Sequence, residues 1–428
     1  MHRVFLSFAF LTFASWAAPA PTLLTRQEAE QIALKNNPRL QVSQLLSKVQ
    51  NQVVRETRAG ELPDLAGNFT ALDAIQGSRL ASGGLPSSLL LTHVGAGVQL
   101  SQLLTDFGRT RNLVASEKLR EKARLADVTA SREDIVLATD QVFFTAIEAQ
   151  ATLRVADQTV DARQSLVDQV TALAAAKLKS TLDLSFAKVD LSQAKLLQLD
   201  ARNNLDSAKA SLNAVLGYDK QVDYQLVEDA EGLPALPPNP DTLIDTAIQN
   251  RPDLQSLHFT EEAAQKFSRA QHDQSRPTVS AIAAVGATPV GSNQYFNSNW
   301  YGAAGLNVTI PIFNGFRYSA QAAEADLQAK AVAERGRDLR NQIFRDVRTA
   351  WLNANTALQR VTVAGELLAQ ANSALDLAKT RYQLGLSSIV ELSQAQLQQT
   401  QAAIGDANAR SQYSFAIATL QFQTGETR

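Results

Sequence analysis

The sequence predicts a mainly helical protein with four β-strands, built as a tandem repeat of one unit of roughly 200 residues. Three observations lead to this fold class: motifs that return at a nearly constant offset, two stretches of about 68 residues with helical patterning, and two pairs of segments in which side chains alternate. Because units of this kind stack or pair rather than fold alone, the content of one unit determines most of the architecture.

The repeat is visible in three landmarks. "ALKNNPRL" at 33–40 returns as "AIQNRPDL" at 247–254, an offset of 214 positions between Pro38 and Pro252. Two further landmarks share an offset of 208 positions: "LLTDFGR" at 103–109 with "PIFNGFR" at 311–317, and "KLKSTLDLSFA" at 177–187 with "GLSSIVELSQA" at 385–395. A common offset at separate places indicates duplication rather than shared composition.

The first residues have the pattern of an export signal. Arg3 supplies a positive start, residues 4–16 form an apolar run, and small residues stand at the −3 and −1 positions of a cut after Ala17. We therefore expect residues 1–17 to be a signal peptide. The alternative is a buried N-terminal helix. The run is shorter than the roughly 20 residues of a membrane-spanning helix, and no later segment approaches that length without charges.

Each unit is expected to contain helices, a strand pair, a long helix and a closing helix. The first repeat is predicted over 18–217, with helices at 26–36 and 38–57, strands near 63–104, the long helix near 109–176 and the last helix near 182–216. A linker with four prolines follows at 218–240. The second repeat is predicted over 241–428, with strands near 279–312, the long helix near 316–383 and the last helix near 387–424.

Period-two alternation predicts the strands. In the last of them, Leu306, Val308, Ile310 and Ile312 are expected on one face, with Asn307 and Thr309 on the other. Asp106 and Asn314 are candidate N-caps where the strands pass into the long helices.

The first long helix contains two series with seven-residue spacing, which predicts supercoiled packing on two sides. The two series are Val128, Ile135, Val142, Ala149, Ala156, and Ala146, Leu153, Val160, Val167, Ala174. Polar residues occupy the remaining faces. This pattern fits the wall of a tunnel with water on both sides, and it fits a surface helix of a solid bundle equally well.

Four strands of membrane-spanning length cannot close a barrel, which is the only sheet that lipid tolerates. Two chains would give eight strands and a filled interior, whereas three would give twelve and room for water. If the strands span a membrane, a conducting protein is therefore at least a trimer. Aromatic residues near the strand ends resemble interfacial girdles: Phe107, Tyr295, Phe296, Trp300, Phe313 and Phe316.

Composition excludes several function classes. A net charge of −2 gives no support to nucleic-acid binding. The absence of cysteine excludes disulfides, thiolate metal sites and a cysteine nucleophile. The four histidines have no partner at metal-ligand spacing. No Ser/His/Asp set or phosphate loop is present, so we expect no enzyme activity and no cofactor.

The duplicated plan resembles the TolC family of outer-membrane efflux and secretion channels over nearly the whole mature chain. The segments that carry the resemblance are "ALKNNP", "LLTDFGR", "PIFNGFR" and "RYQLGLSSIVELSQAQ" at 381–396. It implies a homotrimer with a 12-stranded barrel in outer-membrane lipid and a coiled-coil tunnel in the periplasm. A periplasmic adaptor (membrane fusion protein) and an inner-membrane pump of RND or ABC type are the implied partners, for efflux or type I secretion.

The resemblance also places a gate where the long helices turn back, at 176–182 and 383–388. Asp183 matches the family's gate aspartate and Tyr382 its tyrosine partner, but Ser387 stands where the family has an arginine. A neutral hydrogen bond is weaker than one to a charged group. We therefore expect a gate that is held more weakly, or that is held by Lys179 instead.

The resemblance assigns two further groups of residues. Glu391 matches the first carboxylate of a constriction ring, and Gln394 replaces the second, so a trimer would have three ring carboxylates and a weakened cation preference. Gly385 suits a helix-ending turn, whereas the matching Lys177 departs from it. The residues expected to contact the adaptor are Lys177, Leu178, Ser180, Gly385, Leu386 and Ser388.

One alternative stays open at the level of sequence. An exported, soluble helical scaffold or adaptor of the periplasm would show the same seams. Such a scaffold has no need for four alternating strands with aromatic ends, and this is the feature that separates the two functions.

Overall fold

The computed structural model describes residues 22–75, 93–220, 222, 224–227, 232–287 and 300–426. The predicted signal peptide and the aromatic pair Tyr295 and Phe296 lie outside them. The chain divides into two compact units, and each takes segments from both repeats. We call them the tip unit (up to Asn36, Ala138–Ala235 and Thr356–Phe415) and the sheet unit (Asn37–Leu137, Leu236–Asn355 and from Ala416 onward).

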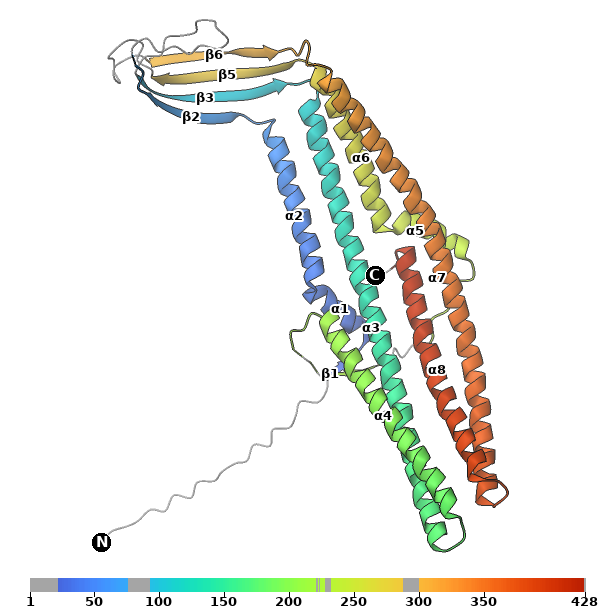
Figure 1. Ribbon diagram of the computed structural model, residues 1–428. Coiled ribbons are helices and arrows are strands. Elements are labelled where there is room, and N and C mark those ends of the chain that lie inside the picture. Colours follow the sequence, from blue (N-terminus) through green and yellow to red (C-terminus); the bar gives the residue numbers. More distant parts are fainter. Residues whose placement is uncertain are drawn as a thin grey trace, which may run out of the picture. The chain divides into compact units, whose positions relative to one another are not determined.

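The sheet unit contains a four-stranded antiparallel sheet in the order β2-β3-β5-β6 (Figure 1). Its strands are β2 (Asp64–Leu72), β3 (His93–Thr105), β5 (Thr278–Ala287) and β6 (Trp300–Thr309). The prediction for β6 was too long. The strand ends at Thr309 because Pro311 has no N–H to donate to a ladder.

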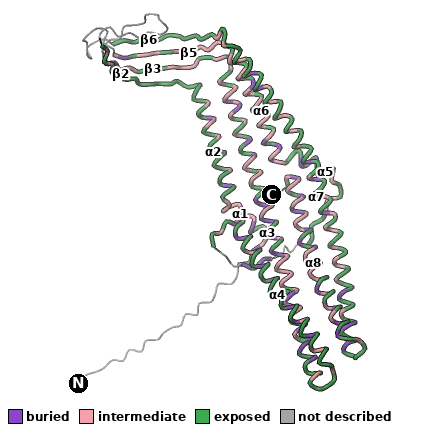
Figure 2. Tube along the Cα trace, in the orientation of Figure 1, coloured by how far each residue is buried: buried purple, intermediate pink, exposed green. Residues whose placement is uncertain are grey.

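The strand register places two different surfaces on the sheet. Leu65 pairs with Leu100, Val98 with Val285, and Leu306 with Ala281, so one face is apolar across all four strands. The opposite face is mostly polar or small, and its members include Asn68, Thr70, Gln99, Ser101, Ser280, Gly286, Tyr301 and Asn307. The apolar face is nevertheless exposed, and Figure 2 shows β2 and β6 as exposed along their length.

The sheet unit also contains helices that come before and after these strands along the chain. They are α2 (Pro38–Ala59), α5 (Pro240–Asn250), α6 (Pro252–His272) and the first parts of α3 (Arg109–Ala175) and α7 (Arg317–Gln383). Ile343 and Val347 of α7 are fully buried against Leu243 of α5, Leu254 of α6 and Leu420. These contacts form one apolar core cluster of the sheet unit.

The joints between strand and long helix use left-handed backbone. Phe107 and Gly108 have φ of 56° and 105°, and Gly315 and Phe316 have φ of 66° and 65°, so the two repeats carry the same pair in opposite order. The Gly108 carbonyl accepts the first helical bond, so Asp106 lies two positions before the N-cap, but its carboxylate still accepts from the Thr110 amide in the first turn at 2.7 Å. At the second joint the Arg317 amide bonds to the Asn314 carbonyl, as the Arg109 amide does to the Asp106 carbonyl, but within the described residues the Asn314 side chain shows no bond to the helix, so it is not confirmed as a cap.

The tip unit contains α1 (Arg26–Asn36), α4 (Thr181–Val215), the remaining parts of α3 and α7, and α8 (Ile389–Thr424) as far as Phe415. It also contains a short parallel pair that the sequence did not indicate, β1 (Thr22–Leu24) with β4 (Tyr224–Leu226). Three-residue strands are too short to show alternation, and β4 lies in the segment that was predicted as a linker.

The two series with seven-residue spacing are buried or half-buried, which agrees with packing of both seams against neighbours. None of their ten members is exposed, and Ala146 and Ala156 are completely buried. Among the described helices, none is both long enough and apolar enough to cross a membrane.

Candidate functional site

The two tip turns have the same geometry. After α3, the Lys177 amide bonds to the Ala174 carbonyl and the Leu178 amide to the Leu173 carbonyl. After α7, Gly385 and Leu386 bond in the same way to carbonyls three and five residues back. Both patterns are Schellman motifs, in which one residue must have positive φ.

Lys177 adopts this conformation although it is not glycine. Its φ is 63°, against 73° for Gly385. The sequence correctly identified the position where the repeats differ, and the turn forms in spite of the difference. Ser180 caps α4 by accepting from the Leu182 amide at 3.1 Å, and Ser388 accepts from the Glu391 amide at 3.4 Å. The two serines predicted as adaptor contacts therefore also stabilise the helix starts.

Tyr382 lies in an apolar cluster where four helices meet. It is 5% exposed and packs with Leu166 and Val170 of α3 and with Ile389 and Leu392 of α8, and Leu184 of α4 lies against the same cluster. A phenol in such a cluster is desolvated. Its hydroxyl has no hydrogen-bond partner within the described part of the chain.

Lys179 lies directly over the ring of Tyr382, with its ammonium nitrogen 4.2 Å from the ring centroid. This is a cation–π contact, and it joins the first hairpin (α3 and α4) to the second hairpin (α7 and α8). Burial raises the pKa of Tyr382, and the negative charge of Asp183 raises it further. Asp183 is therefore close to the phenol, but the described residues show no hydrogen bond between them.

Ser387 does not replace the missing gate arginine. Its hydroxyl is buried, and no hydrogen bond to it is found among the described residues. Of the four predicted gate residues, the structure thus brings Asp183, Lys179 and Tyr382 together and leaves Ser387 without a polar contact.

Glu391 has a partner that the sequence did not reveal. Its carboxylate lies 3.3 Å from the Arg381 guanidinium, and both side chains are about half exposed, at 45% and 56%. An exposed pair of this kind contributes little to stability, but it offsets the charge of a predicted ring carboxylate. Gln394 is exposed one turn along α8. Arg381 stands next to Tyr382 in the sequence, and no periodicity or motif pointed to its partner.

Large apolar side chains are exposed at both turns. Leu178 is 71% exposed in the first, and Leu384 and Leu386 are 68% and 67% exposed in the second. Lys177 and Gly385 are exposed beside them. Apolar side chains that a fold leaves uncovered in this way are typical of protein contact surfaces.

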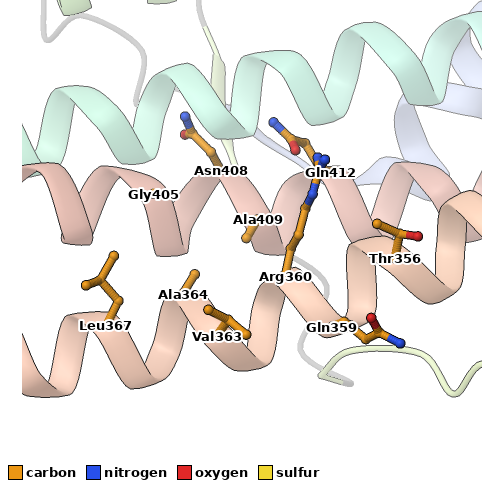
Figure 3. Close-up of a pocket in the computed structure, with 10 residues that line it drawn as sticks. All are labelled: Thr356, Gln359, Arg360, Val363, Ala364, Leu367, Gly405, Asn408, Ala409 and Gln412. Atoms are coloured by element: carbon orange, nitrogen blue, oxygen red, sulfur yellow. The ribbon is translucent and has the colours of Figure 1, made fainter.

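A groove of about 520 Å³ runs between α7 and α8, farther from the turns (Figure 3). Val363 and Leu367 in its wall are 62% and 58% exposed. The full lining is Thr356, Gln359, Arg360, Val363, Ala364, Leu367, Gly405, Asn408, Ala409 and Gln412. No group of three or more histidine, aspartate or glutamate side chains with metal-binding geometry occurs in the described ranges.

Comparison with known proteins agrees with this architecture. The family model "Outer membrane efflux protein" matches residues 30–218 and 243–426, one match for each repeat. The chain is 24% identical to outer membrane protein TolC of Escherichia coli K12 over 411 residues, covering 92% of this chain and 80% of that protein.

Solved structures show the same fold. The crystal structure of CusC has a TM-score of 0.81 at 20% identity and covers 94% of this chain and 92% of that one. The open state of the Neisseria gonorrhoeae MtrE outer membrane channel has a TM-score of 0.77 at 20% identity, covering 94% and 88%. The chain therefore belongs to the outer membrane efflux protein family, and it is an outer-membrane channel of an efflux system rather than an exported soluble scaffold.

Proposed function

We propose that three copies of this chain form a 12-stranded barrel and a helical tunnel that serves as a passive exit duct, gated at the two tip turns. The proposal of a trimer rests on the four-stranded sheet, which has one apolar face and two edges. Within the described residues neither β2 nor β6 has a second neighbour, and an open edge in lipid leaves backbone groups unpaired.

The strand directions allow closure between identical copies. All three pairings in the sheet are antiparallel, so β2 and β6 run in opposite directions. β6 of one copy can therefore pair antiparallel with β2 of the next. Two copies would give eight strands and an interior filled by side chains, whereas three give twelve and leave space for water. The apolar face then meets lipid, and the polar and small face lines the pore.

The helices offer a matching contact between copies. The α7–α8 groove exposes Val363 and Leu367, and on α4 the exposed residues Leu182, Val189 and Leu196 recur every seven positions. A seven-residue apolar stripe is the surface that supercoiled helices bury against a neighbour. A second copy of the chain is the occupant that this groove fits, because the sheet edges already require one.

The gate in this proposal is held by Lys179 on Tyr382, with Asp183 beside them. We expect Lys179→Ala to raise the open fraction in planar bilayers. A cation–π contact is worth about 1 kcal/mol when partly desolvated, which corresponds to about fivefold per copy. The MtrE relative was solved in an open state, which supports a duct that changes between two states.

Lys177→Gly is the matched control for the gate experiment. It removes the same charge from the same turn, leaves Tyr382 untouched, and relieves the positive φ of Lys177. Asp183→Ala tests the aspartate that the family resemblance pairs with Tyr382. If Lys179→Ala and Asp183→Ala both leave the closed state as tight as in the parent, the gate does not lie at these residues.

The constriction is proposed to be the ring of three Glu391 carboxylates, each offset by Arg381. Close carboxylates favour cations, so Glu391→Gln is expected to lower the cation preference and Arg381→Gln to raise it. Reversal potentials in a salt gradient measure both changes. Unchanged reversal potentials in both variants would place the selectivity elsewhere.

The exposed turns are proposed to dock a periplasmic adaptor, which connects the duct to an inner-membrane pump of RND or ABC type. Leu178 and Leu386 supply apolar contact at the two turns, and Lys177 adds positive charge at the first turn only. Cross-linking through cysteines introduced at Ser180 and Ser388 would identify the partner, and the chain has no native cysteine to interfere.

A further inference from the structure

A buried polar network joins the two hairpins, and it lies farther from the tip turns than the cluster around Tyr382. The Arg163 guanidinium of α3 donates to the Asp190 carboxylate of α4 at 3.1 Å, and it also donates to the Gln396 amide oxygen of α8. The Ser393 hydroxyl of α8 donates to the same oxygen of Asp190. One carboxylate oxygen therefore accepts from both hairpins.

The network is shielded from solvent. The side chains of Arg163 and Asp190 are 7% and 16% exposed. Burial lowers the pKa of Arg163, and the negative charge of Asp190 opposes this effect. Each charge therefore stabilises the charged form of the other in this position. Next along α3 and α8, Thr159 and Thr400 form a further hydrogen bond at 3.3 Å.

Apolar residues lie on the turn side of the network. The cluster around Tyr382 contains Leu166 of α3 and Leu392 of α8, each within one helical turn of a network residue. Apolar contacts are non-directional and tolerate sliding, whereas charged hydrogen bonds have a fixed geometry. The polar layer is thus the part of this interface that specifies one alignment of the hairpins.

We infer that Arg163, Asp190, Ser393 and Gln396 form a latch that holds the second hairpin against the first within one copy and so positions Tyr382 beneath Lys179. Separation of the hairpins has to break the bonds of Asp190 to Ser393 and of Arg163 to Gln396. The family arginine is absent at Ser387, and a buried arginine elsewhere then supplies a charged link between the hairpins. The latch is intramolecular, and it rests on the gate proposed above.

Graded variants test the latch in planar bilayers. Ser393→Ala removes one bond between the hairpins and keeps the ion pair, so we expect a two- to fivefold higher open fraction. Asp190→Asn removes the charge that Arg163 faces, and we expect tenfold or more. Ser393→Thr keeps a hydroxyl and should restore the parent value, which a loss of general stability would not explain.

Arg410→Gln is the matched control. The Arg410 guanidinium lies 2.9 Å from Asp406 one turn back in the same helix, so this change disrupts an α8 ion pair without touching the first hairpin. We expect parent-like currents from it. Thermal unfolding followed by circular dichroism confirms that each variant is folded.

A cysteine pair at positions 190 and 393 gives a second readout in this cysteine-free chain. We expect the oxidised Asp190→Cys/Ser393→Cys variant to stay closed and the reduced form to leak. Equal currents in both redox states overturn the latch, whatever the gate variants show. If Lys179→Ala opens the channel but Ser393→Ala and Asp190→Asn do not, the gate stands and the latch fails. If Lys179→Ala has no effect while current follows the redox state, the four residues hold the hairpins together, but the contact of Lys179 with Tyr382 is not the gate and the positioning role of the latch fails with it.

Discussion

Gly286→Ala is expected to disrupt the sheet and reduce the amount of assembled oligomer. A Cβ at this position would lie 2.6 Å from the Ala96 carbonyl oxygen and 2.7 Å from the Tyr301 hydroxyl. Both contacts are too short, and the first is with backbone of the neighbouring strand, which cannot move aside. Overpacking of this kind costs about 1–3 kcal/mol. The fraction that migrates as oligomer on unheated gels measures the effect.

Gly305→Ala is the matched control, because it lies on the same face in the adjacent strand and a Cβ there would meet nothing within 4 Å. We expect normal assembly from it. The Tyr301 side chain also lies over Gly97, where a Cβ would approach the Tyr301 hydroxyl to 2.7 Å. Gly97→Ala should therefore be relieved by Tyr301→Phe. Equal oligomer yields from Gly286→Ala and Gly305→Ala would show that the sheet tolerates the added carbon.

Asp140→Asn is expected to remove a pH dependence of stability from the tip unit. Asp140 is buried in α3 at 2% exposure, and one of its carboxylate oxygens has no hydrogen-bond partner among the described residues. Burial and, to a smaller extent, the nearby Glu30 carboxylate raise the pKa of Asp140 to about 8, against the opposing effect of Arg26 at 3.5 Å. We therefore expect Asp140 to keep a proton at neutral pH.

The sign of the effect follows from proton binding. Between about pH 4 and pH 8 the folded chain holds a proton that the unfolded chain has released. The free energy of unfolding of the parent must therefore fall as pH rises through this range, by about 2–5 kcal/mol. The neutral amide of Asp140→Asn binds no proton and can still donate to Glu30, so its stability should fall less steeply with pH. The dependence that remains comes from other carboxylates with a raised pKa, such as Glu133 and Glu148.

Thermal midpoints at pH 5 and pH 8 measure this difference. We expect the parent to be less stable at pH 8 and Asp140→Asn to exceed the parent there. Asp161→Asn is the control, since Asp161 is an exposed carboxylate on the same helix. A parent whose midpoint rises from pH 5 to pH 8 would contradict the assignment of a protonated Asp140.

The sequence predicted the elements with long, regular patterns and missed those set by single contacts. α3 was expected over about 109–176 and occupies Arg109–Ala175, because some 68 residues without proline or glycine leave little choice. The alternation of β2, β3, β5 and β6 was likewise visible. The strand pair β1–β4 and the early end of β6 were not predicted, since three residues carry no period and one proline outweighs a pattern.

For the candidate site, the sequence predicted residues that the structure places near one another, but not all of their contacts, and their role in gating stays a prediction. Resemblance placed the gate at Asp183 and Tyr382, and the structure brings both to the turns. The partners Arg381, Arg163 and Asp190 were not found, because each contacts a side chain on a different helix. A contact of this kind depends on the relative rotation of two helices, which no single helix encodes.

The two unpaired edges of the sheet have a genetic consequence. If β6 of each copy must meet β2 of the next, the ring closes through three equivalent junctions, and one faulty edge opens the whole ring. A chain with a defect only in β2 would then inactivate every mixed assembly that it forms with intact chains. With equal amounts of both and random mixing, about one assembly in eight would contain intact copies alone. Edge mutations in this protein should therefore be dominant, whereas mutations that prevent folding of the chain should be recessive.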